Sequence, residues 1–180
     1  MRGRISLAAA VVAALTAVPG AAQPTGHLLQ DPNDHVVLVP TTPGLSMCAF
    51  RRVLPDGTKE ALDFQVPAGR FLVVTDVEWL VSKYFVTLGS PNFPLKADRQ
   101  VVAELLTRAA GQRGAWNLVF QSRGVTVPVN GEIAAGSEHV TGGVTVAAGA
   151  TLCLVGRTNS HSDYAVFTQA VLRGYLVDAL

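Results

Sequence analysis

The chain has 180 residues, of which 49% are hydrophobic and 15% charged, and its formal net charge is +1. So high a hydrophobic share excludes an intrinsically disordered protein. A near-neutral charge argues against a dedicated DNA- or RNA-binding protein, because such proteins usually carry a basic excess. The length suits one domain rather than two. We therefore expect a single folded domain that has no nucleic acid partner.

The first 22 residues have the pattern of a secretory signal peptide. Arg2 and Arg4 precede an apolar run from Ile5 to Val18, and a break with small residues follows at 19–22. This run is shorter than the roughly 20 residues that a membrane-spanning helix needs. We expect a cleaved leader and a secreted or periplasmic protein with no stable membrane span after cleavage. An uncleaved anchor is the alternative.

The chain after the leader divides into a short arm and one domain. Residues 23–35 are polar and contain two prolines and a glycine, so they predict a flexible N-terminal arm. Residues 36–180 alternate short apolar runs with turn residues and predict a single domain of strands. Without the two leader arginines the formal charge becomes −1.

The first strands of this domain are marked by β-branched runs and turns. Val36 to Val39 is such a run, and residues 45–53 predict the next strand. Pro55-Asp56-Gly57 predicts a turn, because proline presets φ and glycine accepts positive φ. Residues 61–66 alternate apolar and polar side chains, which is the period of a half-buried strand.

Two strands are predicted next, at 71–75 and 77–88, because both segments are rich in Val, Phe, Trp and Tyr. Trp79 is expected in the core. Asp76 and Glu78 stand two residues apart and would share one strand face. Paired carboxylates of this kind can hydrolyse glycosides when they face each other across a cleft, but a polar strand face is the simpler interpretation.

Residues 98–110 are ambiguous between helix and strand. A helical stripe of apolar residues, a capping Asp98 and a terminating Gly111 predict one short helix. The alternative is a strand that turns at 111–114 into a second strand at 115–121. We favour the strand, because the surrounding pattern is β throughout and the turn is rich in glycine.

The C-terminal third gives the clearest strand pattern. Val125 to Val129 is followed by the turn dipeptide Asn130-Gly131, and short strands are predicted at 144–146 and 151–155. The closing stretch contains Gly174, which suggests a bulge or a close backbone approach.

About nine or ten short strands predict an all-β fold, an antiparallel β-sandwich or small barrel. The sequence "strand, Ala-Gly turn, strand" at Val66–Leu72 and Val146–Leu152 resembles that of jelly-roll domains, which implies a jelly-roll-like sandwich but no family function. Both faces of several strands are apolar, for example at Val73 and Val74. A homo-oligomeric interface would bury the second face.

Cys48 and Cys153 are the two cysteines, and they lie 105 positions apart. An oxidising compartment favours a disulfide between them, and two buried thiols are the alternative. Two cysteines are too few for a metal site, and neither has the spacing of a redox motif. We predict neither a metal nor a cofactor.

Catalytic chemistry has only weak candidates. His161 and Asp163 contain residue types that a hydrolase or lyase could use, but sequence neighbours rarely form a catalytic triad. Glu138 and His139 are adjacent, so on a strand they would point to opposite faces. No catalytic residue is assigned, and an enzyme is the less favoured class.

Two aromatic residues are candidates for ligand binding. Trp116 follows a turn and Tyr84 lies in a predicted strand, and an exposed ring of either kind could stack on a sugar. We therefore expect an exported, non-enzymatic β-sandwich protein with a binding or surface-assembly role for a glycan or protein ligand. A carbohydrate-binding module that uses these aromatics, and a hydrolase or lyase near His161, are the alternatives.

Overall fold

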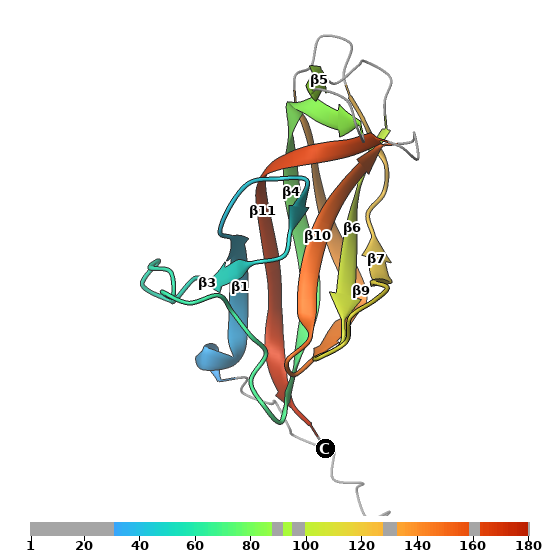
Figure 1. The fold of residues 1–180 in the computed structure, drawn as a ribbon. Helices are drawn as coiled ribbons and strands as arrows, with labels where there is room; N and C mark the ends of the chain where they lie inside the picture. Colours follow the sequence, from blue (N-terminus) through green and yellow to red (C-terminus); the bar gives the residue numbers. More distant parts are fainter. Residues whose placement is uncertain (1–30, 88–91, 95–99, 128–132, 159–162, 180) are drawn as a thin grey trace, which may run out of the picture. The chain divides into compact units, whose positions relative to one another are not determined.

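The computed structural model describes residues 31–87, 92–94, 100–127, 133–158 and 163–179. Within these ranges one turn of 3-10 helix precedes eleven strands, all of which pair antiparallel (Figure 1). The all-β prediction is confirmed. In chain order the elements are η1 (Pro32–Asp34), β1 (His35–Pro40), β2 (Ser46–Met47), β3 (Phe50–Arg52), β4 (Arg70–Thr87), β5 (Asn92–Pro94), β6 (Gln100–Arg108), β7 (Asn117–Gln121), β8 (Val125–Thr126), β9 (Ala134–Ala147), β10 (Thr151–Thr158) and β11 (Asp163–Asp178).

The C-terminal strand β11 organises the sheet. One edge of β11 pairs with β4 over nearly its whole length, and β4 pairs in turn with β9 and β5. The other edge of β11 pairs with β10 at Tyr164 and Ala165 and with β1 from Leu172 to Tyr175. β10 continues to β6 and β2, and β6 continues to β7 and β8. Figure 1 shows the long red β11 running beside the green β4.

A single cluster of buried side chains joins the two groups of strands that diverge from β11. Its fully buried members include Leu38 of β1, Val77 of β4, Leu105 of β6, Leu154 of β10 and Phe167 of β11. A shared core is what an antiparallel sandwich needs. Because hydrogen bonds connect all the strands into one sheet, the sandwich and its jelly-roll topology stay a prediction.

The strand favoured for the ambiguous segment 98–110 is confirmed as β6, whose backbone pairs with β10 from Val101 to Arg108, and the alternative helix is wrong. Another local prediction is wrong: residues 61–66, predicted as a strand, form an irregular segment that we name the strap. Its alternation is nevertheless real: Phe64 is half-buried and Val66 buried, while Asp63 and Gln65 are exposed. The alternation shows that the segment has an inner and an outer side, but it does not pair with a neighbouring strand in a regular ladder.

β4 is one continuous strand rather than the two that the sequence predicts. Its pairing to both neighbours shifts register at Thr75: Val74 and Asp76 lie opposite the consecutive residues Gly174 and Arg173 of β11. Such a bulge inserts one extra residue and changes which side chains face inward. Gly174 therefore sits at a close backbone approach, as its place in the sequence suggests, because a Cβ there would lie 2.0 Å from the Val73 carbonyl oxygen.

The leader and most of the predicted arm lie outside the described residues, as does the turn Asn130-Gly131. The last residues of the arm form η1 and the first position of β1. In the described part of the chain, none of the helical structure has the length and apolar character needed to cross a bilayer.

The sequence predicts that the second apolar face of β4 needs a subunit interface to bury it. Val73 on that face is already buried within a single chain, at 8% exposed. The oligomeric state stays a prediction.

Candidate functional site

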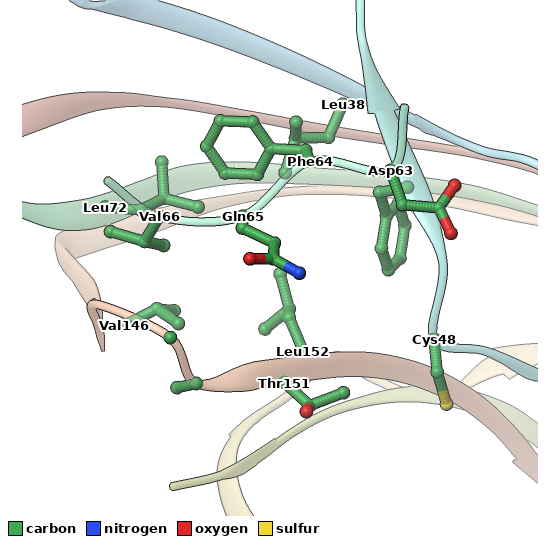
Figure 2. Close-up of a pocket in the computed structure, with 13 residues that line it drawn as sticks. Leu38, Cys48, Asp63, Phe64, Gln65, Val66, Leu72, Val146, Thr151 and Leu152 are labelled. Atoms are coloured by element: carbon green, nitrogen blue, oxygen red, sulfur yellow. The ribbon is translucent and has the colours of Figure 1, made fainter. Parts of the chain in front are cut away.

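A cavity of about 190 Å³ lies beneath the strap (Figure 2). We name it the strap cavity. Its walls come from side chains of five strands, from the strap and from the turn between β9 and β10. The lining residues are Leu38, Cys48, Phe50, Asp63, Phe64, Gln65, Val66, Leu72, Val146, Gly149, Ala150, Thr151 and Leu152. The strand contributions are almost wholly aliphatic or aromatic, so the floor of the cavity is apolar.

The strap is held over the cavity by one backbone hydrogen bond and by packing. The Phe64 N–H donates to the Phe50 carbonyl oxygen over 2.6 Å, and Phe64 packs against the core. Val66, at 6% exposed, anchors the end of the strap before the turn at 67–69. Leu62 is 80% exposed at the other end. A segment with so few backbone hydrogen bonds can open locally at small cost.

The polar groups of the cavity gather on the strap and on Thr151. Figure 2 shows the Gln65 amide pointing from the strap toward Leu152, while the Asp63 carboxylate points away from the apolar side chains. Asp63 is 4.0 Å from the Arg51 guanidinium, which is outside hydrogen-bond range, and both side chains are about half exposed. The cavity thus has an apolar floor and a rim that carries an amide, a hydroxyl and a carboxylate.

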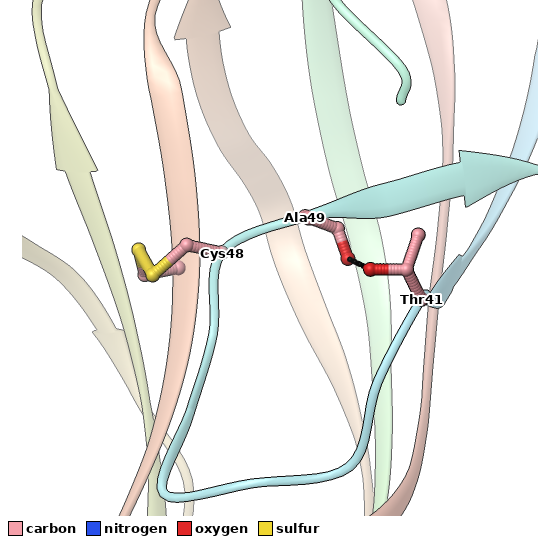
Figure 3. The surroundings of a disulfide bond; sticks show 4 residues. Thr41, Cys48 and Ala49 are labelled. Atoms are coloured by element: carbon pink, nitrogen blue, oxygen red, sulfur yellow. Dashed lines mark hydrogen bonds between the residues drawn. A yellow bond between two sulfur atoms is a disulfide. The ribbon is translucent and has the colours of Figure 1, made fainter. Parts of the chain in front are cut away.

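The predicted disulfide is present (Figure 3), and one of its two cysteines, Cys48, is among the residues that line this cavity. It joins Cys48, which precedes β3, to Cys153, which is buried in β10. The same loop is tied to the end of β1, because the backbone and the hydroxyl of Thr41 both donate to the Ala49 carbonyl oxygen. The loop that carries Cys48 is therefore fixed covalently to β10 and by hydrogen bonds near β1.

A second candidate is a group of charged side chains on the outer face of β9, β4 and β11. His139, Asp76 and Arg173 are cross-strand partners in one row, and Ser137 and Glu78 are partners in the next. Cross-strand partners share a face, so these five side chains lie together. We name them the outer polar cluster. The Thr75 bulge produces it, because it turns Asp76 and Glu78 outward while Val77 and Trp79 stay buried.

The acidic side chains of the outer polar cluster are held by hydrogen bonds from its other members and from Thr75. The His139 Nδ1 lies 3.0 Å from Asp76 Oδ1, and the Thr75 hydroxyl donates to Asp76 Oδ2 over 2.7 Å. These hydrogen bonds, chiefly that of His139, lower the pKa of Asp76. Arg173 donates to Glu78, which raises the pKa of Arg173. As expected from their adjacency, Glu138 makes a different contact and accepts the Arg123 backbone N–H.

An open groove of about 460 Å³ adjoins the cluster and shares Glu78 and Ser137 with it. Leu80, Ala135 and Val171 add apolar surface. The Asp76 and Glu78 carboxylates and the Arg173 guanidinium of the cluster make hydrogen bonds within it, so these groups are already engaged. Within the described residues, no three His, Cys, Asp or Glu side chains come together as metal ligands.

The two aromatic candidates are not brought together by any strand pair in the described residues. Trp116 is half-buried before β7, and the Arg108 guanidinium lies 4.5 Å from its ring centroid, so one face of the indole is already covered. The backbone of Tyr84 pairs with Pro94 of β5, and its side chain lies outside what the structure describes. His161 lies outside the described residues, as does the side chain of Asp163.

Sequence reasoning missed both candidate sites. The strap cavity has no linear signature, because its lining residues extend from position 38 to position 152. The contact between Asp76 and His139 spans 63 positions and depends on the pairing of β4 with β9. Only the shared face of Asp76 and Glu78 could be read from their spacing, and the strand pairing confirms it.

Comparison with models of protein families, with curated proteins and with solved structures yields no match to this chain.

Proposed function

We propose that the protein is an exported, non-enzymatic binding protein that holds a small ligand with an apolar part and a polar group in the strap cavity. The observation that carries this proposal is the cavity itself, which measures about 190 Å³ and has an apolar floor. Ligand sites are typically concave and mostly apolar, with a few polar groups that orient the ligand. An engineered apolar cavity of about 150 Å³ accepts benzene, so this volume suits a molecule of about six to eight heavy atoms.

A binding role suits the polar groups of the cavity better than catalysis does. Among its described lining residues, Asp63 is the one ionisable group besides the bridged Cys48. General acid–base catalysis usually needs a second titratable group within reach of the same substrate. Gln65 and Thr151 can orient a ligand through hydrogen bonds, but neither is a base at neutral pH.

Two features support export. The first 22 residues have the order of a signal peptide: basic residues, an apolar run and then small residues. The pair Cys48–Cys153 is compatible with an oxidising compartment, where disulfides persist.

The test is a titration of the purified protein with toluene, followed by NMR chemical shifts of backbone amides. We expect saturable shifts in the strap and around Leu152, with a Kd on the order of 1 mM, because few apolar groups are buried and association itself is costly. Ala150→Phe should fill the cavity and abolish these shifts.

Ala135→Phe is the matched control, because Ala135 lies in the outer groove and not in the strap cavity. It should leave toluene binding unchanged. Loss of binding in this variant but not in Ala150→Phe would move the site to the groove. Absence of saturable shifts in the unsubstituted protein up to the solubility limit of toluene would refute the proposal.

A further inference from the structure

We infer that the strap cavity takes uncharged ligands, and that a short primary amide matches it best, because the polar group turned into the cavity is the Gln65 amide. This inference rests on the proposed binding function and deepens it by naming the ligand class. It depends on the three hydrogen-bonding side chains of the lining, Asp63, Gln65 and Thr151, and on the direction of the one charge among them.

The lining turns no charged side chain into the cavity. Asp63 is its one ionisable residue besides the bridged Cys48. The Asp63 carboxylate points away from the apolar side chains and is 56% exposed (Figure 2). An ionised end group that enters the cavity would therefore lose hydrating water without meeting an opposite charge, which is costly. The cavity should reject carboxylate and ammonium end groups alike.

The Gln65 amide is the polar group that the end group of a ligand would meet. The residue as a whole is exposed, but its amide is turned from the strap toward Leu152 of the apolar floor (Figure 2). Among the described residues this amide has no hydrogen-bond partner, and neither has the Thr151 hydroxyl. A ligand whose chain lies on the floor would bring its end group to an amide that is free to bind it.

A primary amide on the ligand is the uncharged group that uses the Gln65 side chain most fully. The side-chain amide offers an acceptor oxygen and donor hydrogens, and a second primary amide can pair with it through two reciprocal N–H···O hydrogen bonds. A carboxylate has no hydrogen to donate and an ammonium group has no lone pair to accept with, so each of them can form half of this pairing. The ligand class is therefore a short alkyl chain that ends in a primary amide.

The experiment compares four probes at pH 7 in the same NMR titration: toluene, pentanamide, pentanoate and hexylamine. The last three have equal numbers of non-hydrogen atoms, which fit the size of the cavity, and they differ in the charge of the end group. We expect pentanamide to bind at least about tenfold more tightly than pentanoate and than hexylamine, because the charged probes alone must give up hydration without a counter-charge.

Two substitutions test whether the Gln65 amide sets this preference. Gln65→Leu removes both hydrogen-bonding groups, so it should weaken pentanamide about fivefold and leave toluene within about twofold. Gln65→Glu replaces the inward amide by a carboxylate of the same shape. Hexylamine should then become the tightest of the three polar probes, because its ammonium group meets an opposite charge.

Asp63→Asn is the matched control, because it removes a carboxylate from the same strap that points away from the apolar side chains of the cavity. It should leave the affinity ratios of the three polar probes unchanged. If toluene binds but pentanamide is less than about tenfold tighter than either charged probe, the inference is overturned and the binding function stands. Loss of the preference in Asp63→Asn, or its persistence in Gln65→Glu, has the same meaning. If none of the four probes binds, the proposed function itself fails.

Discussion

The Asp76 carboxylate and the His139 imidazole meet across β4 and β9, with Oδ1 and Nδ1 3.0 Å apart. Asp76 faces outward because Thr75 is an extra residue in β4 relative to β11, and the Thr75 hydroxyl holds the other carboxylate oxygen of Asp76. His139 of β9 is the cross-strand partner of Asp76. The bulge therefore performs two functions. It reverses the inward and outward alternation of β4, and it supplies the hydrogen bond that orients the carboxylate.

The lowered pKa of Asp76 makes part of the stability pH-dependent. A carboxylate with a lowered folded-state pKa stabilises the protein above its unfolded pKa, near 3.8, and this stability is lost as the pH falls through the folded pKa. The effect should be below about 1 kcal/mol, because the side chain is 37% exposed and solvent screens the pair. Asp76→Asn should therefore lower the free energy of unfolding at pH 6 more than at pH 2.

Urea unfolding at pH 2 to 6 measures this difference. Asp63→Asn serves as the comparison variant, because its carboxylate is 4.0 Å from Arg51 and lies outside the outer polar cluster. An Asp76→Asn variant whose free energy of unfolding is lowered equally at both pH values would contradict the prediction.

Gly174 is predicted to be irreplaceable by any residue that has a Cβ. An added Cβ would lie 2.0 Å from the Val73 carbonyl oxygen and 3.0 Å from the Val74 Cα, and backbone atoms cannot move aside as a side-chain tip can. Gly174→Ala should force β11 away from β4 and lower the free energy of unfolding by about 3 kcal/mol or more.

Gly44→Ala is the matched control for this effect. Gly44 has no left-handed φ, and the nearest atom to its added Cβ is 3.8 Å away, which is ordinary contact. Its cost should stay within about 1 kcal/mol. Equal stability of the two variants in urea unfolding would show that β4 and β11 are not as close as the structure has them.

The sequence predicted those features that depend on local period. Leu72 and Val74 face the core on one side of Thr75, and Val77 and Trp79 face it on the other. This change of parity is visible in the sequence, where it predicts a break between two strands. A bulge and a break produce the same local pattern, and the pairing of β4 with β11 on both sides of Thr75 distinguishes them.

Features that depend on which segments pair could not be predicted. The alternation of residues 61–66 correctly assigned Phe64 and Val66 to the inner side, yet a strand also needs a regular ladder to a partner backbone, and among the described residues this segment makes the bond from Phe64 to Phe50 alone. The strap cavity follows from the same fact, because a segment that does not pair with the sheet leaves space beneath it.

The disulfide should contribute a large share of the stability. Cys48 and Cys153 are 105 positions apart, and a cross-link over that separation removes about 4 to 5 kcal/mol of unfolded-chain entropy by loop-closure arguments, within a typical range of about 2 to 5 kcal/mol. Reduction should therefore lower the melting temperature markedly. Because Cys48 also lines the strap cavity, reduction should weaken toluene binding as well.

Thermal unfolding with and without dithiothreitol measures the first effect, and the toluene titration measures the second. The variant with both Cys48→Ala and Cys153→Ala is the control: it should melt at a reduced temperature that dithiothreitol does not change. Since Cys153 is buried, its replacement also leaves a small cavity, so reduction of the unsubstituted protein is the cleaner measure. Alkylation of two thiols in the native, unreduced protein would contradict the bridge and both of its predicted consequences.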